Sequence, residues 1–356
     1  MKPLRVGIVG IRRGASLARV FHNHPKCTLT TVCDLDRERA EAFVEEHHVE
    51  TALTDFDDLL ASDLDVIVVA TPLPLHATQS VAALEAGKHV FSEVPAANSL
   101  DECQRIVEAV ERSGKAYMMG ENCNYFDRTV AWKHEVDAGR LGDIFYGEAE
   151  YVHDCRSLMT DAEGNPTWRA SMPPIQYCTH SLGPLMLWTG DRCVRASGMH
   201  TGSHVSPQWG AIDMEVGIFT TAGGRVFKIL CGFSVVREPA MHFYCLYGTK
   251  GCLETKRTDW DEAKGHFPTE EKGMQHSPVD LTPRPAPPEA KLGGHGTSEF
   301  FMVDDFVTAV VEGAPPPIDV YASMDQTAPG ICAHLSAQHG GELIEVPDFR
   351  PAGGAR

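Results

Sequence analysis

Apolar residues come in short runs over the first third of the chain, and each run is followed by a stretch in which they recur at helical spacing. The runs predict buried strands over residues 4–10, 28–34, 65–70, 89–92 and 116–119. The intervening stretches predict helices over residues 15–24, 37–47, 76–87 and 100–113. This alternation is typical of βαβ units, so we expect an α/β domain with a doubly wound parallel sheet over residues 1–124.

Longer strands with alternating apolar and polar positions follow a helix predicted over residues 128–138. They cover residues 142–152, 213–220, 225–236, 242–247 and 251–256. Such alternation is typical of antiparallel sheets with one solvated face. We therefore expect residues 125–356 to form an α+β domain with a large open, mostly antiparallel sheet, and its unpaired edges and open face favour a homodimer or homotetramer.

Two further segments complete the predicted second domain. Residues 257–296 are rich in proline, glycine and charge, and a loop of that length is typically functional or an oligomer contact. Apolar residues at helical spacing then predict a final helix over residues 298–312.

Composition narrows the classes of function. A chain of 356 residues can hold two cores, and its formal charge of −18 argues against nucleic acid or an anionic membrane as partner. No apolar run is long enough to span a bilayer, and no signal peptide is evident at the N-terminus. The eleven cysteines lack any Cys-x-x-Cys spacing, which predicts free thiols, a cytoplasmic location and no metal site.

A glycine-containing turn joins the first predicted strand to the first helix. Gly10 holds the first position of a degraded dinucleotide motif, Arg12 replaces the second glycine, and Ala15 takes the third with Gly14 beside it. Turns of this kind place the pyrophosphate of a dinucleotide on the amides of a helix N-terminus. An ordinary strand–turn–helix connection is the alternative interpretation.

The end of the second predicted strand indicates which dinucleotide is bound. Asp34 lies where a carboxylate can accept hydrogen bonds from a ribose diol, and it would repel a 2′-phosphate. We therefore predict NAD as the cofactor. The cations Arg37, Arg12 and Arg13 keep NADP as the lesser alternative.

Two later turns extend the predicted cofactor site. Thr71 and Pro72 follow the strand 65–70 and are expected to line the nicotinamide ribose, while His76 either joins them or simply begins a helix. Glu93 follows the strand 89–92 and precedes Val94 and a proline. Its carboxylate can orient the substrate or the ribose, or act as a base; the alternative is a solvated charge at a strand end.

These motifs resemble the Gfo/Idh/MocA family of NAD(P)-dependent sugar oxidoreductases over nearly the whole chain. The resemblance rests on residues 7–15, 66–72, 84–90, 93–95 and 139–144. It implies a Rossmann domain followed by an α/β domain whose open sheet commonly forms the oligomer interface. It also implies a lysine after the glutamate, but this chain has Val94, which cannot transfer a proton.

Within that family the chain is most similar to NAD-dependent glycosidases of the α-N-acetylgalactosaminidase type, which also have Glu-Val-Pro. The matching segments are residues 92–97, 101–103, 118–122, 125, 153–154, 168–169, 177–184 and 294–296. Cys178 stands where proline is usual and Thr297 where another glycine is expected. The match implies a cofactor contact for Asn122.

The resemblance places Tyr177 and His180 against the sugar as catalytic residues, with Glu93. Tyr177 and His180 are three residues apart and therefore share one side of a helical turn. An imidazole titrates near neutrality and a phenol can relay a proton, so the pair can replace the missing lysine. A core tyrosine and a satisfied histidine are the alternative.

Other residues suit a sugar pocket, because aromatic faces bind C–H surfaces and charged groups bind hydroxyls. This set comprises Tyr125, His153, Asp154, Trp168 and Arg169. His295, between two glycines, is expected either to reach the pocket from a loop of the second domain or to lie in a solvent-exposed turn.

The resemblance implies a sugar or glycoside substrate and hydride transfer at a sugar hydroxyl, C3. In the glycosidases oxidation at C3 acidifies C2–H, elimination expels the C1 substituent, water adds, and the ketone is reduced again. Two alternatives stay open: a simple sugar or inositol dehydrogenase, and a non-catalytic NAD(H)-binding sensor.

Overall fold

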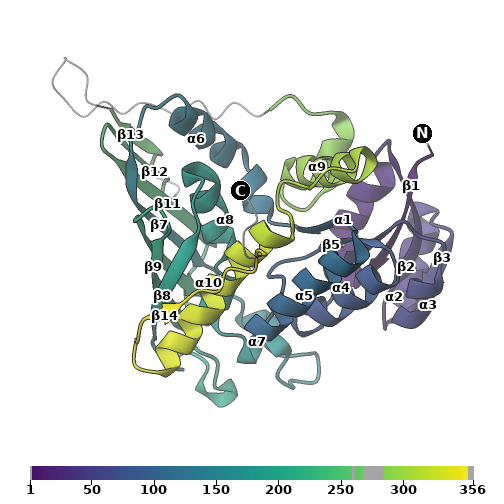
Figure 1. Cartoon of the computed structure of the whole chain (residues 1–356). Coiled ribbons are helices and arrows are strands. Elements are labelled where there is room, and N and C mark those ends of the chain that lie inside the picture. Colours follow the sequence, from purple (N-terminus) through teal and green to yellow (C-terminus); the bar gives the residue numbers. More distant parts are fainter. Residues whose placement is uncertain (1, 259–260, 268–283, 352–356) are drawn as a thin grey trace. The chain divides into compact units, whose positions relative to one another are not determined.

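The computed structural model describes residues 2–258, 261–267 and 284–351, which form two compact units. The first unit comprises residues 1–125, 284–324 and 349–356, and the second comprises residues 126–283 and 325–348. Figure 1 shows the elements of both along the colour-coded chain. The prediction of two consecutive domains, 1–124 and 125–356, does not include the return of residues 284–324 to the first unit.

A six-stranded parallel sheet forms the centre of the first unit within the described residues, in the order β3-β2-β1-β4-β5-β6. Its strands are β1 (Leu4–Val9), β2 (Cys27–Cys33), β3 (Thr51–Leu53), β4 (Val66–Val69), β5 (His89–Ser92) and β6 (Tyr117–Met119). The reversal of strand order beside β1 is the switch point at which doubly wound sheets bind ligands. The predicted fold of this part is confirmed.

Helices on the two faces of this sheet complete the Rossmann arrangement, because right-handed crossovers place α1 and α2 opposite α4 and α5. They are α1 (Ile11–Asn23), α2 (Arg37–His47), α3 (Phe56–Ala61), α4 (His76–Glu85) and α5 (Leu100–Ser113), with 3₁₀ turns η1 (Leu73–Leu75) and η2 (Asn122–Tyr125). Local signals mark their ends: Ser99 caps α5 and Gly114 closes it in the left-handed conformation.

The returning segment contains η6 (Pro288–Leu292) and α9 (Ser298–Glu312). Helix α9 lies over α1 and β5, where the ring of Phe306 meets Phe21 edge-on at 6.5 Å and Phe91 at 5.4 Å. This buried aromatic contact explains why the segment packs on the first sheet.

A mixed eight-stranded sheet dominates the second unit within the described residues, in the order β13-β12-β11-β7-β10-β9-β8-β14. The strands are β7 (Ile144–Val152), β8 (Cys193–His200), β9 (Met214–Thr221), β10 (Val226–Gly232), β11 (Met241–Gly248), β12 (Cys252–Glu254), β13 (Lys264–His266) and β14 (Ile344–Glu345). Among these pairings β7–β10 is parallel and the others are antiparallel, so the predicted mostly antiparallel sheet is confirmed.

Helices lie on one face of this sheet. The second unit contains α6 (Asp127–Asp137), α7 (Trp168–Ser171), α8 (Thr179–Thr189) and most of α10 (Val320–Gln338), with 3₁₀ turns η3 (Arg156–Leu158), η4 (Pro174–Tyr177) and η5 (Pro207–Trp209). On α10, the hydroxyl of Ser336 accepts a 2.9 Å hydrogen bond from Gly198 N–H on β8. The helix predicted over 298–312 is therefore not the final one, because α10 follows it.

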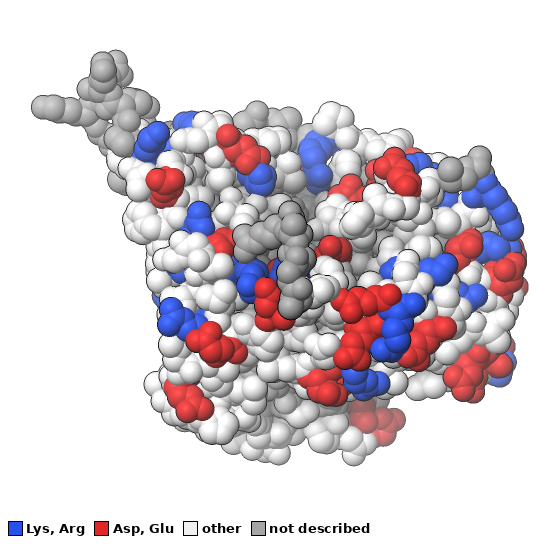
Figure 2. Space-filling view, in the orientation of Figure 1, with Lys and Arg blue, Asp and Glu red and all other residues white. Residues whose placement is uncertain are grey.

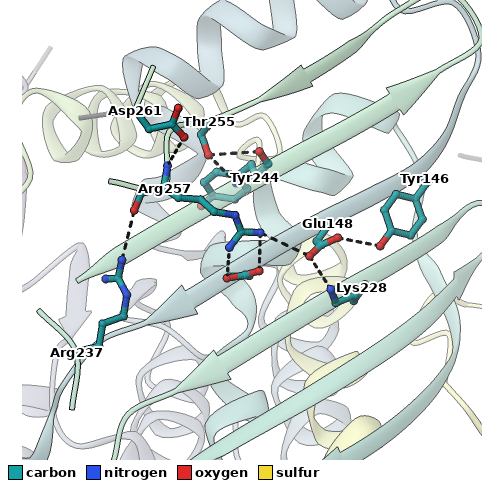
Figure 3. Close-up of polar contacts among 9 residues, drawn as sticks. Tyr146, Glu148, Lys228, Arg237, Tyr244, Thr255, Arg257 and Asp261 are labelled. Atoms are coloured by element: carbon teal, nitrogen blue, oxygen red, sulfur yellow. Dashed lines mark hydrogen bonds and ion pairs between the residues drawn. The ribbon is translucent and has the colours of Figure 1, made fainter. Parts of the chain in front are cut away.

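The other face of this sheet combines apolar side chains with a polar network. Arg257 donates two 2.9 Å hydrogen bonds to the carboxylate of Glu150, and Lys228 pairs with Glu148 at 2.7 Å (Figure 3). Exposed apolar residues accompany this network on several strands. They include Met199, Ile218 and Tyr247.

Other sequence expectations concern loops, charge and cysteines. Of the predicted loop 257–296, residues 259–260 and 268–283 lie outside the described residues, whereas the described remainder includes β13 and η6. The eleven cysteines all lie within the described residues, and none of them forms a disulfide. In the described residues no helix combines the length and apolarity needed to cross a bilayer. Figure 2 shows acidic and basic side chains mixed over the visible face.

Candidate functional site

The turn between β1 and α1 is shaped for an anionic ligand. Gly10, the N-cap of α1, has a φ of +90°, and a Cβ there would lie 2.5 Å from the carbonyl oxygen of Ala70. A side chain is therefore excluded. As the N-cap, Gly10 has no side chain that could bond the first amides of α1, and Ile11 N–H donates to Asp34, so the positive dipole end and the amides that follow Ile11 can serve a phosphate.

Close contact between α1 and the sheet occurs at Gly14. A Cβ at this position would lie 2.8 Å from Ile8 Cδ1 and 2.9 Å from the Cβ of Ala70. The motif spacing assigned this contact to Ala15, which is only half-buried, and Arg12 is exposed. The third glycine position of the dinucleotide motif is thus filled by Gly14.

Asp34, the carboxylate predicted to bind a ribose, lies buried directly after β2. Its Oδ2 accepts a 2.9 Å hydrogen bond from Ile11 N–H, and its Oδ1 pairs with Arg39 at 3.0 Å. Arg37 instead faces Glu41 at 3.5 Å, so the cation beside Asp34 is Arg39. Leu35 is 91% exposed next to this carboxylate, an apolar surface suited to an adenine face.

His76 joins the turns that follow β4 and β5. Its Nε2 lies 2.7 Å from Thr71 O and its Nδ1 lies 2.8 Å from Pro95 O. The ring is buried, and this burial lowers its pKa although both carbonyls oppose the shift. His76 therefore fixes the backbone beside Thr71 and Pro72, and its ring nitrogens face these carbonyls.

Glu93 belongs to an ion-pair cluster that begins in the glycine turn. Arg13 lies 2.9 Å from Glu93 Oε1 and 3.7 Å from Glu299 Oε1, and both carboxylates are buried. Arg13 was predicted as a possible ligand of a 2′-phosphate. The cluster instead directs its guanidinium toward the Glu93-Val94 segment, where Val94 is buried as well.

The Gly-His-Gly segment joins the same cluster. His295 Nδ1 lies 2.9 Å from Glu299 Oε1, and Gly294 N–H donates to Glu299 Oε2 at 2.5 Å. Burial opposes ionisation of Glu299, but these hydrogen bonds and Arg13 lower its pKa below the ordinary value. His295 was expected on a second-domain loop; it belongs to the first unit because its segment leads into α9.

Two predicted residues lie in η2 after β6. Asn122 is buried there, and the buried Tyr125 donates a 2.9 Å hydrogen bond to Asp305 on α9. Burial, followed by the charge of Asp305, raises the pKa of Tyr125 well above its ordinary value. The phenol predicted to bind sugar is thus already bonded to α9.

Tyr177 and His180 lie together in the second unit, with ring centroids 5.3 Å apart. Two residues that sequence reasoning missed adjoin them: Tyr151 lies 5.2 Å from His180, and His242 stacks on Tyr151 at 4.4 Å. Strand pairing places Tyr151 on β7 opposite His242 on β11. Phe233 closes the group, 5.8 Å from Tyr177. We call these five side chains the ring cluster.

The remaining predicted sugar ligands lie around that cluster or in the loop that follows β7. His153 Nδ1 lies 3.3 Å from the hydroxyl of Tyr151. Asp154 pairs with Arg156 at 2.6 Å, and this bonding lowers the pKa of the Asp154 carboxyl. On α7 the guanidinium of Arg169 lies 4.5 Å from the ring centre of Trp168. Proton-carrying groups and aromatic faces thus occur together in this unit.

Comparison with known families assigns both parts of the chain. Residues 4–121 match the Gfo/Idh/MocA oxidoreductase family, NAD-binding Rossmann fold, and residues 213–353 match the glycosyl hydrolase 109 C-terminal domain. The chain joins a Gfo/Idh/MocA NAD-binding domain to a glycosyl hydrolase 109 C-terminal domain. It is an NAD-dependent enzyme of the oxidoreductase class.

Relatives of this NAD-dependent enzyme match nearly its full length. A glycosyl hydrolase family 109 protein of Solibacter usitatus is 29% identical over 386 aligned positions, covering 97% of this chain and 88% of that protein. An oxidoreductase domain protein from Kribbella flavida has the same fold, with a TM-score of 0.81 and 23% identity. The match covers 98% of this chain and 100% of that protein. Levoglucosan dehydrogenase in complex with NADH and L-sorbose also has this fold. Its TM-score is 0.80 and its sequence identity 21%, and the match covers 98% of this chain and 100% of that chain.

Proposed function

We propose that this Gfo/Idh/MocA enzyme cleaves a glycoside by transient oxidation at C3 of the sugar, with no net change of the cofactor. The observation that carries the proposal is the ring cluster, in which the phenol of Tyr177 and the imidazole of His180 adjoin. These groups can move protons in place of the lysine that Val94 replaces. The glycosyl hydrolase 109 match of the same unit supports a glycoside as substrate.

The first unit fits NAD. The helix N-terminus at Gly10 suits the diphosphate, Asp34 suits the adenosine ribose and disfavours a 2′-phosphate, and the Thr71–Pro72 turn follows β4 at the same strand ends. Asn122 is assigned to this cofactor by resemblance. When bound, the nicotinamide supplies hydride transfer, accepting a hydride from C3 and returning it at the end.

In the ring cluster, His180 takes the proton of the C3 hydroxyl as the C3–O bond becomes a carbonyl. The ketone acidifies the C2–H bond, and a base of the cluster removes that proton. The electron pair forms the C1–C2 double bond and expels the C1 substituent, which Tyr177 protonates. Water then adds at C1 while C2 regains a proton, and reduction at C3 is completed by a proton returned to its oxygen.

Solvent isotope incorporation tests this scheme. We expect an aryl glycoside turned over in deuterated water to give free sugar carrying deuterium at C2, because the abstracted proton exchanges with solvent before water adds. Mass spectrometry and proton NMR of the product measure this. A product without deuterium at C2 would exclude the elimination route.

A substrate panel separates the alternatives. Aryl glycosides and free sugars are supplied with NAD while nitrophenol and absorbance at 340 nm are read together. Nitrophenol without accumulation of NADH supports the glycosidase. NADH formed in proportion to free sugar identifies a simple sugar dehydrogenase, and neither signal with retained NAD binding indicates a sensor.

We also propose that two copies associate through the face of the second sheet that carries Glu148, Lys228 and Arg257 (Figure 3). This face exposes Ile218 by 42% and Tyr247 by 40%, and a stable interface buries about 1,600 Å² in total. Ile218→Asp should therefore give monomers in size-exclusion chromatography with light scattering. Ala42→Asp, at an exposed position of α2, is the matched control and should leave the mass unchanged; an oligomer that survives Ile218→Asp contradicts the proposed face.

A further inference from the structure

Tyr177 ends the short 3₁₀ turn η4, so the position of this turn determines where its phenol lies. A turn of four residues makes few backbone hydrogen bonds within itself, here from Gln176 N–H to Pro173 O and from Cys178 N–H to Ile175 O. Its position must therefore be fixed by what surrounds it. Two groups of the second unit contact the peptide groups at Ile175 from opposite sides.

The first of these groups is the carboxylate of Glu215 on β9, which binds the N–H of Ile175. Its Oε2 accepts a 3.0 Å hydrogen bond from Ile175 N–H, and its Oε1 lies 2.8 Å from His334 Nδ1 on α10. The Glu215 side chain is completely buried. Burying a carboxylate is costly unless its oxygens are bonded, and here each oxygen has a partner.

On the carbonyl side, the backbone of α10 itself approaches the turn at Gly330. A Cβ added there would lie 2.5 Å from Ile175 O, 2.8 Å from Cys178 Sγ and 3.2 Å from Gln176 Cα. Gly330 and His334 are four residues apart and therefore share one side of α10. One side of α10 therefore contacts the turn directly at Gly330. The same side also bonds, through His334, the Glu215 carboxylate that accepts from Ile175 N–H.

We infer that Glu215, His334 and Gly330 are positioning residues that place Tyr177 for proton transfer. The inference rests on the proposed role of Tyr177 and extends it to three residues that do not themselves belong to the ring cluster. The physical reason is the steep dependence of proton transfer on geometry, since a displacement of about 1 Å can lower a rate by about 100-fold. A purely structural role would instead change stability alone.

Variants of α10 test this. His334→Leu removes the donor to Glu215, whereas His334→Asn keeps a nitrogen at the place of Nδ1 and should restore its function. Gly330→Ala introduces the excluded Cβ. His339→Leu, at an exposed position just past the end of α10, is the matched control. We expect His334→Leu and Gly330→Ala to lower kcat about 10- to 100-fold with a smaller change in KM, and His334→Asn and His339→Leu to stay within about threefold of the parent.

The NAD dissociation constant should stay within about twofold in all four variants, because the cofactor residues belong to the other unit. A second readout is independent of turnover: ¹⁹F NMR of protein labelled with 3-fluorotyrosine, in which Tyr177→Phe assigns the signal of Tyr177. That signal should shift in His334→Leu and Gly330→Ala but not in His334→Asn or His339→Leu.

The two readouts distinguish failure of this inference from failure of the proposed function. If the parent enzyme cleaves no glycoside and oxidises no sugar, yet the Tyr177 signal shifts as expected, the positioning holds and the proposed function does not. An unshifted signal, or an unchanged kcat in folded His334→Leu and Gly330→Ala, overturns the inference. So does a loss of kcat that His334→Asn fails to restore.

Discussion

Tyr177→Phe and His180→Ala are each expected to lower kcat for glycoside turnover by about 10²- to 10⁴-fold, the usual contribution of a positioned acid or base. The phenol and the imidazole adjoin in the ring cluster, and Val94 leaves no amine after Glu93 to replace them. The double variant should lose little more than the worse single variant, because groups that act as one unit are not additive. Steady-state kinetics with an aryl glycoside measures all three.

Matched controls separate chemistry from folding. Tyr146→Phe removes a phenol from the outer side of β7, where its hydroxyl bonds Glu148 at 3.0 Å, and should leave kcat within about twofold of the parent. Binding of NAD, followed by nicotinamide fluorescence or calorimetry, should persist in every variant. Unchanged turnover in both Tyr177→Phe and His180→Ala would contradict the assignment and favour a role outside catalysis.

The sequence predicts the first sheet well because its signals are local. Helix α2 begins after the cap Asp36 and α5 after the cap Ser99, and both observed ranges equal the predicted ones. Strand β3 and helix α3 were missed because elements of three and six residues carry too little periodicity to distinguish them from a loop.

Helix α10 shows a different limit. Pro329 and Gly330 lie in its interior, and in a sequence this pair indicates a turn. The structure keeps the helix because its backbone packs directly on the η4 turn, where Gly330 leaves the room that a Cβ would fill. Tertiary packing thus overrides the local turn signal. A contact that depends on the absence of a Cβ at Gly330 produces no hydrophobic pattern in the sequence from which it could be predicted.

The residues of the candidate site also differ in whether the sequence predicts them. Gly10 and Asp34 could be predicted because a single strand–turn–helix unit with its following strand positions both. Tyr151 and His242 could not, because each looks like an ordinary strand residue and only the register between β7 and β11 brings them together. Arg39 was missed in favour of Arg37, although its place three residues after the cap Asp36 directs it back to the helix start, where it pairs with Asp36 at 2.7 Å.

Asp34→Ser is expected to shift the preference between NAD and NADP by about 100-fold. A serine forfeits a charged hydrogen bond to the ribose, which contributes about 1.5–3 kcal/mol and weakens NAD binding about tenfold or more. It also removes a repulsion that reaches about 4 kcal/mol for unit charges 4 Å apart at an effective dielectric of about 20, so NADP binding strengthens at least about tenfold. Calorimetric titration with both dinucleotides measures the two constants.

The matched control for this shift is Asp36→Ser. Asp36 also pairs with Arg39, but its carboxylate is more exposed, and serine preserves the cap of α2, so the ratio should stay within about twofold. Adding Arg39→Ala to Asp34→Ser should reduce the gain in NADP affinity without abolishing it, because Arg39 then no longer supplies a cation to the 2′-phosphate whereas the repulsion by Asp34 stays removed. A parent enzyme that binds both dinucleotides equally, or a ratio unchanged by Asp34→Ser in a folded protein, would remove Asp34 as the selective group and leave the choice of cofactor to another residue of the first unit.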